Sequence, residues 1–236
     1  MLTIDHLTKH YKGTDKGVTD VSLHVAPGSL CAFVGPNGAG KTTLLKCVTG
    51  IHDFDAGAIR IGGVDLRADP IACKRQFAYL PDNPDLYEYL TGSQYLAFLA
   101  DVFALSEDVR RARTEALCAE FELSDALGSL ISAYSHGMKQ KLALIGALLH
   151  EPKLLILDEP FVGLDPKASR TLKAQMRALC DRGGAIFFST HVLDVAEKLC
   201  DSAVIIRDGR IAAQGRMEEL IGKGSLEDVF MEVVDE

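Results

Sequence analysis

The chain has 236 residues, of which 47% are hydrophobic and 25% charged, and its formal net charge is −8. This composition is ordinary for a globular domain and excludes a disordered, collagen-like or low-complexity chain. The chain has more acidic than basic side chains, so its overall composition indicates no basic patch of the kind that binds nucleic acid. We therefore expect no nucleic-acid partner. The length predicts one large domain, or one domain with a substantial insert.

Several features are missing from the sequence. No apolar run approaches the roughly 18–20 residues that span a bilayer, and the N-terminus lacks the basic and apolar regions of a signal peptide. The six cysteines are scattered without a CxxC pair, which favours buried thiols over metal or disulfide roles. We therefore expect a cytosolic chain.

The first third of the chain predicts short strands and one helix. Residues 21–25 alternate apolar and polar side chains, as in a half-buried strand. Residues 30–34 are continuously apolar, which suits a strand buried on both faces. A glycine-rich loop and a helix over residues 41–48 follow. Further strands are predicted at residues 56–63 and 77–80.

The middle of the chain, from about residue 90 to residue 132, predicts helices. Leu96, Leu99, Ala100 and Phe103 follow a spacing of three to four, and a second helix opens at residues 106–108. Strands return at residues 154–157, 185–188 and 203–206, separated by helices at about residues 166–181 and 192–200. This alternation predicts an α/β fold with a parallel sheet covered on both faces.

Residues 35–42 fit the pattern GxxxxGK[ST] between a buried strand and a helix, which predicts a phosphate-binding loop. Its glycines let backbone N–H groups point at phosphate oxygens, and the helix N-terminus adds partial positive charge. Lys41 would reach the β- and γ-phosphates, and the Thr42 hydroxyl would be a Mg²⁺ ligand. A glycine turn without this function would not require the Lys-Thr pair. The candidate nucleotide-binding residues are Gly35, Asn37, Gly38, Ala39, Gly40, Lys41, Thr42 and Thr43.

The strand at residues 154–157 ends in two acids, Asp158 and Glu159. Ligands of parallel sheets bind beyond the carboxyl ends of the strands. Asp158 would hold Mg²⁺, directly or through water, and Glu159 would orient or deprotonate a water that attacks the γ-phosphate. Solvated acids at a strand end are the alternative, and the phosphate loop on the same sheet argues against it. Neither Asn37 nor Asn83 starts a guanine-reading NKxD motif, which favours adenine.

Together these motifs resemble the ATPase subunit of an ATP-binding cassette (ABC) transporter over nearly the whole chain. Residues 163–166 resemble the D-loop, residues 188–191 the switch-histidine segment and residues 134–140 the signature LSGGQ, and Tyr11 matches the aromatic residue that stacks on adenine. The resemblance implies a P-loop NTPase (RecA-like) fold with a mainly parallel sheet, an N-terminal antiparallel β subdomain and an α-helical insert.

The resemblance also implies a domain organisation. The whole chain, residues 1–236, would be a single ABC ATPase domain. Its nucleotide-binding core with the β subdomain would comprise residues 1–83 and 138–236. The helical subdomain would comprise residues 84–137 and end at the signature motif.

The family resemblance assigns further site residues. His191 would contact the γ-phosphate and act with Glu159 and Lys41 in catalysis. Ser135 and Gly137 would act in trans on the nucleotide of a second ATPase subunit, because the family works as a head-to-tail dimer with two ATP molecules sandwiched. Asp165 of the D-loop joins this set. The alternatives are a packing role for Tyr11, a satisfied polar residue at 191, and a plain helix N-cap and turn at Ser135 and Gly137.

Two positions depart from the family pattern. Asp82 replaces the glutamine that touches Mg²⁺, and we retain it as a metal-site residue. His136 replaces the first glycine of the signature; it could donate near the γ-phosphate or point outward, and the outward orientation is favoured. If His136 contributes charge, ATPase activity should fall as the pH rises through about 6–7.

Residues 86–92 and 225–230 are similar to ABC-2-type exporter ATPases. This likeness implies an ATP-hydrolysing subunit that powers export at the cytoplasmic face of a membrane, through a separate membrane-spanning permease and as a homo- or heterodimer. The alternative is a non-transport ABC ATPase acting on ribosomes or DNA, but such proteins usually carry a long coiled-coil insert or two cassettes. A P-loop kinase is disfavoured by the signature and the D-loop.

Overall fold

The central sheet of the molecule has six strands in the order β10-β9-β3-β8-β7-β6, and all but β10 run parallel. The structure is a computed structural model that describes residues 1–13 and 16–235. The strands of this sheet are β3 (Leu30–Val34), β6 (Phe77–Leu80), β7 (Leu154–Asp158), β8 (Ala185–Thr190), β9 (Ser202–Arg207) and β10 (Arg210–Arg216).

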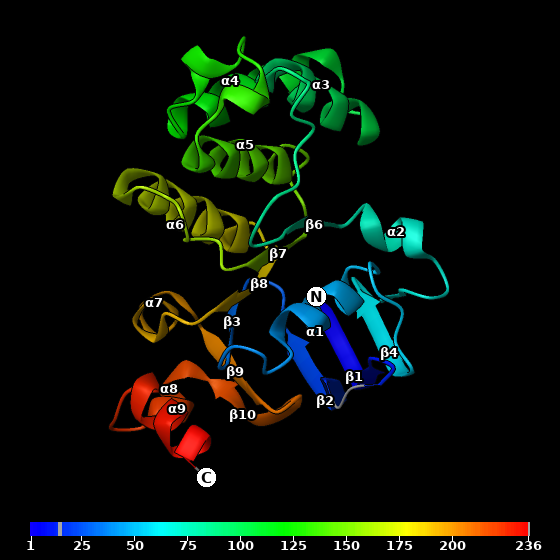
Figure 1. Ribbon diagram of the computed structural model, residues 1–236, viewed down its shortest axis with the longest axis vertical. Coiled ribbons are helices and arrows are strands. Elements are labelled where there is room, and N and C mark those ends of the chain that lie inside the picture. Colours follow the sequence, from blue (N-terminus) through cyan, green and yellow to red (C-terminus); the bar gives the residue numbers. More distant parts are fainter. Residues whose placement is uncertain (14–15, 236) are drawn as a thin grey trace.

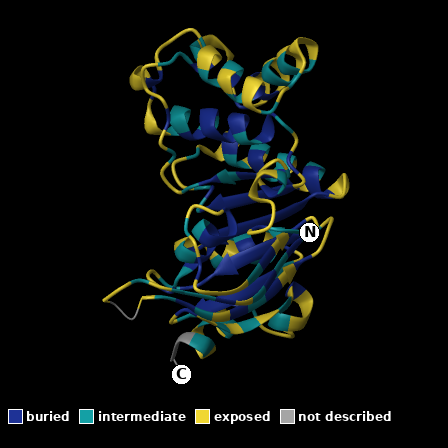
Figure 2. Ribbon diagram, turned by 90° about the vertical axis from the view of Figure 1, so that its right-hand side faces the viewer, coloured by how far each residue is buried: buried dark blue, intermediate teal, exposed yellow. Residues whose placement is uncertain are grey.

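The middle strands β3, β7 and β8 are buried along their whole length, as their continuous apolar runs predict (Figure 2). Their side chains alternate between two hydrophobic clusters. On β3, Leu30 and Ala32 belong to the cluster on the side of the helical layer, whereas Cys31 and Phe33 belong to the cluster on the side of the second sheet. The sheet is therefore covered on both faces and holds its strand ends rigidly.

The second sheet is antiparallel, with strand order β2-β1-β4-β5, and lies beside the central sheet (Figure 1). Helix α1 (Lys41–Val48) packs with residues of both sheets in one cluster. This arrangement brings the N-terminal hairpin next to the loop that precedes α1. The strands are β1 (Leu2–His10), β2 (Gly17–Val25), β4 (Ala56–Ile61) and β5 (Val64–Asp65).

The helical insert forms the opposite end of the molecule from α9 (Figure 1). It contains α3 (Gly92–Val102) and α4 (Glu107–Glu120), and α5 (His136–Leu148) begins at its end. Thr91 and Gln94 form a capping box that fixes the start of α3. The mainly parallel sheet, antiparallel β subdomain and helical insert match the fold class predicted from the sequence.

The structure also contains short elements that the sequence did not predict. These are β10, α2 (Pro70–Lys74), α8 (Met217–Ile221) and α9 (Leu226–Asp235), while α6 (Pro166–Asp181) and α7 (Leu193–Leu199) match predicted helices. The strand predicted over residues 56–63 ends at Ile61, because Gly62 and Gly63 adopt positive φ angles and turn the chain into β5. Among residues 1–13 and 16–235, no helix combines the length and apolarity needed to cross a bilayer.

Candidate nucleotide-binding site

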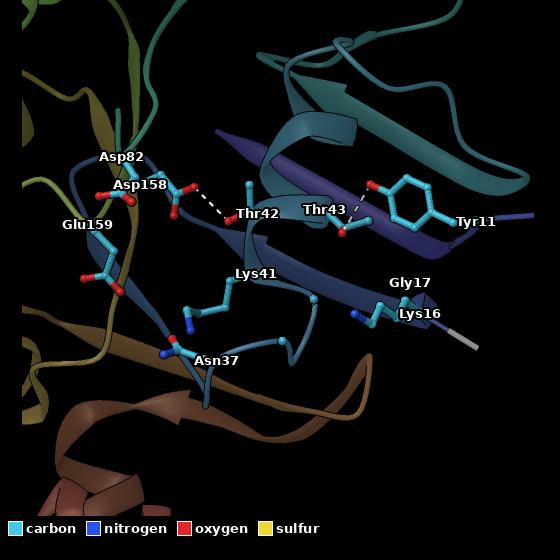
Figure 3. A pocket seen from close by; sticks show the side chains of 12 residues that line it. Tyr11, Lys16, Gly17, Asn37, Lys41, Thr42, Thr43, Asp82, Asp158 and Glu159 are labelled. Carbon is cyan, nitrogen blue, oxygen red and sulfur yellow. Dashed lines mark hydrogen bonds between the residues drawn. The ribbon is translucent and has the colours of Figure 1, made fainter. Parts of the chain in front are cut away.

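A cavity of about 450 Å³ opens beyond the carboxyl ends of the central strands (Figure 3). It is bounded by the loop that joins β3 to α1, by the residues that follow β6 and β7, and by the start of β2. This is the position where parallel sheets bind ligands. The lining residues are Tyr11, Lys16, Gly17, Asn37, Gly38, Gly40, Lys41, Thr42, Thr43, Asp82, Asp158 and Glu159.

The loop before α1 is closely packed against its neighbours. Gly40 has a φ of 106°, and a Cβ atom there would lie 2.8 Å from Val18 Cγ1. A Cβ atom at Gly35 would lie 2.5 Å from the carbonyl oxygen of Ile206. Both positions therefore require glycine. The first backbone N–H groups of α1 have no partner within the helix, so this loop offers an anion-binding site to the cavity.

Lys41 is the first residue of α1 and is only 8% exposed. Its ammonium donates to the carbonyl oxygens of Gly35, at 2.6 Å, and Pro36, at 3.1 Å. Burial lowers the pKa of Lys41, and the negative charges of Glu159 and Asp158 oppose that shift only in part. Lys41 is also one of the residues that line the cavity.

Asp158 ends β7 and is 3% exposed. Its Oδ2 accepts a hydrogen bond of 2.9 Å from the Thr42 hydroxyl (Figure 3). Its Oδ1 accepts a hydrogen bond from the hydroxyl of Ser189 on the neighbouring strand β8. The structure thus brings Asp158 and Thr42 together as predicted. Ser189 was not among the predicted site residues, although its place two residues before His191 is a signal that the sequence contains.

Glu159 follows directly and lines the cavity with a largely buried side chain. Its Oε1 lies 2.9 Å from Nδ1 of His191, whose own side chain is largely exposed. Glu159 has a φ of 48°, which is uncommon for a residue with a side chain and directs it away from the strand path. Two of the three predicted catalytic residues, Glu159 and His191, are therefore adjacent in space.

Asp82 lines the same cavity, as predicted. Burial raises its pKa, and the negative charges of Asp158 and Glu159 raise it further. The hydroxyl of Thr42 and the carboxylates of Asp158 and Asp82 are oxygen donors of the kind that Mg²⁺ prefers. In the described part of the chain no cluster of three or more His, Cys, Asp or Glu could hold a metal by itself. This donor set fits Mg²⁺, which commonly combines one or two carboxylates with substrate phosphates.

Tyr11 closes the other end of the cavity (Figure 3). Its hydroxyl lies 3.4 Å from the Thr43 hydroxyl, and its ring meets His52 edge-on at 5.9 Å. Lys16 and Gly17 also line this end, and the sequence reasoning missed both because they belong to a hairpin rather than to a recognised motif.

Six predicted site residues are not among those that line this cavity: Gly35, Ala39, His191, Ser135, Gly137 and Asp165. Ser135 caps α5 by accepting a hydrogen bond of 3.3 Å from the Met138 amide. Asp165 caps α6 by accepting one of 2.8 Å from the Ala168 amide, and it also pairs with Lys141 of α5 at 2.7 Å.

The start of α5 and the turn before α6 are also in direct contact. The exposed His136 ring packs against Gly163, where a Cβ atom would lie 2.7 Å from His136 Cδ2. A Cβ atom at Gly137 would lie 3.0 Å from the Gly163 carbonyl oxygen. The two segments therefore form one surface that is separate from the cavity.

The fold and the phosphate loop define a P-loop NTPase. Comparisons with known proteins identify the family within this class. A family model described as ABC transporter matches residues 18–162, more than half of the chain. The ABC-type transporter ATP-binding protein EcsA of Bacillus subtilis is 34% identical over 241 residues, which cover 100% of this chain and 97% of EcsA. The Nod factor export ATP-binding protein I of Paraburkholderia xenovorans is 35% identical and is matched over 93% of this chain and 72% of its own length.

Solved structures agree with this assignment. A structure described as the ATP-binding subunit of an ABC transporter has a TM-score of 0.95 and 38% identity, and the match covers 99% of both chains. A dimeric, post-hydrolysis structure of the ATP-binding cassette MJ0796 with ADP and Pi has a TM-score of 0.83 over 92% of this chain and 99% of its own; its 21% identity supports the fold alone. The present chain belongs to the ABC transporter family and is one of its ATP-binding, ATP-hydrolysing proteins.

Proposed function

We propose that this chain is the ATPase subunit of an exporter and acts with Mg²⁺, a second ATPase subunit and a separate membrane-spanning permease. One observation carries the proposal: the phosphate loop, with Lys41 at its helix start, and the carboxylates of Asp158 and Glu159 open on the same cavity. An anion-binding loop beside paired carboxylates is the arrangement that phosphoryl transfer to water needs.

The phosphate loop binds the triphosphate in this proposal. The backbone amides from Gly35 to Thr43 surround the phosphates, and Lys41 contacts the β- and γ-phosphates. Tyr11 stacks on the adenine from the far end of the cavity. Fixed N–H dipoles and a buried ammonium stabilise the charge of the transition state without reorganisation, which supplies most of the catalysis.

Thr42, Asp158 and Asp82 hold the Mg²⁺ ion in this proposal. The ion would supply positive charge that offsets the negative charge developing on the phosphates. Asp158 is kept in place by its two hydrogen-bonded neighbours. Burial first, and then the negative charges of Asp158 and Glu159, raise the pKa of Asp82, and a divalent cation would offset the second cause.

Glu159 orients and deprotonates the attacking water, and His191 holds the Glu159 carboxylate and contacts the γ-phosphate. The 2.9 Å contact between them supports this pairing. An imidazole that binds one oxygen of the carboxylate leaves the other oxygen for water.

Ser135, Gly137 and Asp165 act across a head-to-tail dimer in this proposal. They lie outside the cavity of their own chain and on one exposed surface, so a second subunit could present its nucleotide there. The MJ0796 structure is described as dimeric, which supports such an assembly for the fold. The partner is either an identical chain or a related one.

The permease docks on a groove between the core and the helical subdomain, residues 84–137. This groove of about 440 Å³ lies between β6 and helices α3 and α5. Four aromatic and aliphatic side chains of the helical subdomain are exposed to solvent. Exposed apolar side chains that lie together commonly mark an interaction surface. The four side chains are those of Tyr87, Tyr89, Phe98 and Val102. Docking there would place the subunit at the cytoplasmic face of a membrane, and the Nod factor relative supports the outward direction.

Glu159→Gln tests the catalytic part of the proposal. Glutamine keeps the size of the side chain but cannot accept a proton, so ATP binding should persist while turnover falls by on the order of 100-fold or more. Size-exclusion chromatography with ATP should show a dimer that accumulates. Glu115→Gln, on the exposed side of α4, is the matched control and should behave as wild type. Turnover near the wild-type rate in Glu159→Gln would refute the assignment.

Co-purification from native membranes tests the transport part. The protein, solubilised with detergent from its own cells, should carry a single partner with several membrane spans. Recovery with ribosomes or DNA instead would oppose the transport proposal.

A further inference from the structure

Ser189 contacts both Asp158 and Glu159 where β7 and β8 end. It is the fifth residue of β8, is completely buried, and is the register partner of Asp158 across the β7–β8 pair. The strand before it, residues 185–188, is wholly apolar. A hydroxyl in such a place needs partners, because burying it unpaired costs free energy.

The Ser189 hydroxyl makes two hydrogen bonds with distinct directions. It donates to Oδ1 of Asp158 and accepts from the backbone amide of Glu159 at 3.2 Å. The same amide lies 3.2 Å from the Ser189 carbonyl oxygen. One residue therefore binds the side chain of the first acid and the backbone of the second.

These contacts restrict both acids. With Oδ1 held by Ser189, the Asp158 carboxylate can turn only Oδ2 toward Thr42 and the cavity. The anchored Glu159 amide supports the positive φ angle that directs this residue into the cavity beside His191. Residues that hold a metal ligand in one orientation commonly set metal affinity as strongly as the ligands do.

We infer that Ser189 is a positioning residue for the Mg²⁺ site and for Glu159: its hydroxyl fixes the Asp158 carboxylate and the Glu159 backbone in the orientation that the metal and the attacking water require. This inference rests on the proposed function of the same cavity and names a residue that acts through Asp158 and Glu159. Its competitor is a structural role only, in which Ser189 contributes to the stability of the β7–β8 pair.

Ser189→Ala separates the two roles. We would measure the thermal stabilisation of the full chain by a non-hydrolysable ATP analogue, first in EDTA and then over a range of Mg²⁺ concentrations. The stabilisation in EDTA should remain, whereas the Mg²⁺ concentration for the half-maximal further increase should rise about tenfold. Steady-state turnover should fall by about tenfold, with less effect on KM. Ser189→Thr retains the hydroxyl and should restore most of both quantities.

The matched control is Thr49→Val. Thr49 is also a buried hydroxyl, but it donates only to the carbonyl oxygens of Leu45, at 2.9 Å, and Lys46, at 3.2 Å, at the end of α1. Its replacement should cost stability and leave the Mg²⁺ dependence unchanged. An unchanged Mg²⁺ dependence in Ser189→Ala, or an equal shift in Thr49→Val, would overturn the inference.

If Ser189→Ala does not fold, Ser189→Cys, with a weak donor of similar shape, must show the raised Mg²⁺ requirement, and a wild-type requirement there overturns the inference. Absence of Mg²⁺-dependent ATPase activity in the wild-type chain would instead refute the proposed function, so the two failures are distinguishable.

Discussion

The nucleotide cavity and the groove beside the helical insert satisfy their polar groups differently. In the cavity, Thr42, Asp158 and Ser189 are bonded to one another across two strand ends. In the groove, the Tyr79 hydroxyl and both ring nitrogens of His150 are buried without a hydrogen-bond partner. The first region is preorganised for chemistry by its own residues, whereas the second buries polar atoms that its own side chains do not satisfy.

The largest expected effect is the loss of ATPase activity when the nucleotide cavity is altered. Lys41→Ala removes the buried ammonium beside the phosphates, so ATPase activity should fall by on the order of 100–1000-fold. Equilibrium binding of ATP and steady-state hydrolysis measure the two parts of the loss. Lys173 on α6 is partly buried and does not line the cavity, so it provides the control, and Lys173→Ala should retain wild-type hydrolysis. Retention of more than about a tenth of the wild-type rate in Lys41→Ala would contradict the proposed role.

A substitution among the exposed side chains beside the groove should have the opposite effect: it should weaken docking of the proposed permease and spare ATP hydrolysis. Phe98→Asp places a charge among exposed aromatic residues that include Tyr87, whose ring centroid lies 5.6 Å away. Co-purification of the permease should fall by about tenfold or more, because a desolvated charge in an interface core is costly. Hydrolysis by the isolated chain should change little.

Met231→Asp is the control for the groove, because Met231 is similarly exposed but lies on α9 at the far end of the molecule. Equal loss of the permease in both variants would mean that the groove has no special part in docking.

A smaller effect concerns pH. Burial lowers the pKa of His150 to about 4, while its ring stacks on Phe103 at 3.6 Å. The unfolded chain takes up a proton below a pKa of about 6.5, so His150 should reduce the free energy of unfolding as the pH falls from about 6.5 toward 4, by up to about 1.4 kcal/mol per unit. His150→Phe keeps the stacking and removes the titration. Thermal denaturation from pH 7.5 to 4.5 should show an increasing advantage for the variant, and a constant difference would contradict this.

The smallest effect concerns the link between α5 and the turn before α6. Lys141→Gln removes the ion pair with Asp165, whose pKa is lowered first by the hydrogen bond from Lys141. The pair should contribute less than about 1 kcal/mol, since Asp165 is exposed. The lowered pKa means that this contribution is present above about pH 4 and is lost below it. Urea denaturation at low and high salt measures it, and a cost that does not decrease with salt would argue against an electrostatic origin.

The sequence predicted the central strands and the phosphate loop because their signals are local. The apolar runs of β3 and β7 and the spacing from Gly35 to Thr42 are each complete within a few residues. Ser189 and Lys16 were missed because their importance depends on contacts with residues distant in sequence. The short α2 and α8 were missed because five-residue helices are too short to show a helical period.

The predicted site residues that lie outside the cavity also combine a local signal in the sequence with contacts that only the fold creates. The sequence motif identified Ser135 and Asp165 and offered a helix N-cap as the alternative at Ser135, and the structure shows both residues as helix caps outside the cavity. Their proposed role requires a second subunit, so neither the sequence pattern nor a single chain contains the complete arrangement. The pairing of Lys141 with Asp165 joins residues of two different helices, and no pattern within either helix predicts it.

The position of β8 between β3 and β7 has a consequence for synthesis of the chain. Strand β3 hydrogen-bonds only to β8 and β9, which begin at Ala185 and Ser202. A nascent chain that ends before residue 185 therefore carries the complete phosphate loop on a strand that has no neighbour. Because such non-local pairing is slow to form, the ability to bind ATP should arise late and abruptly during translation.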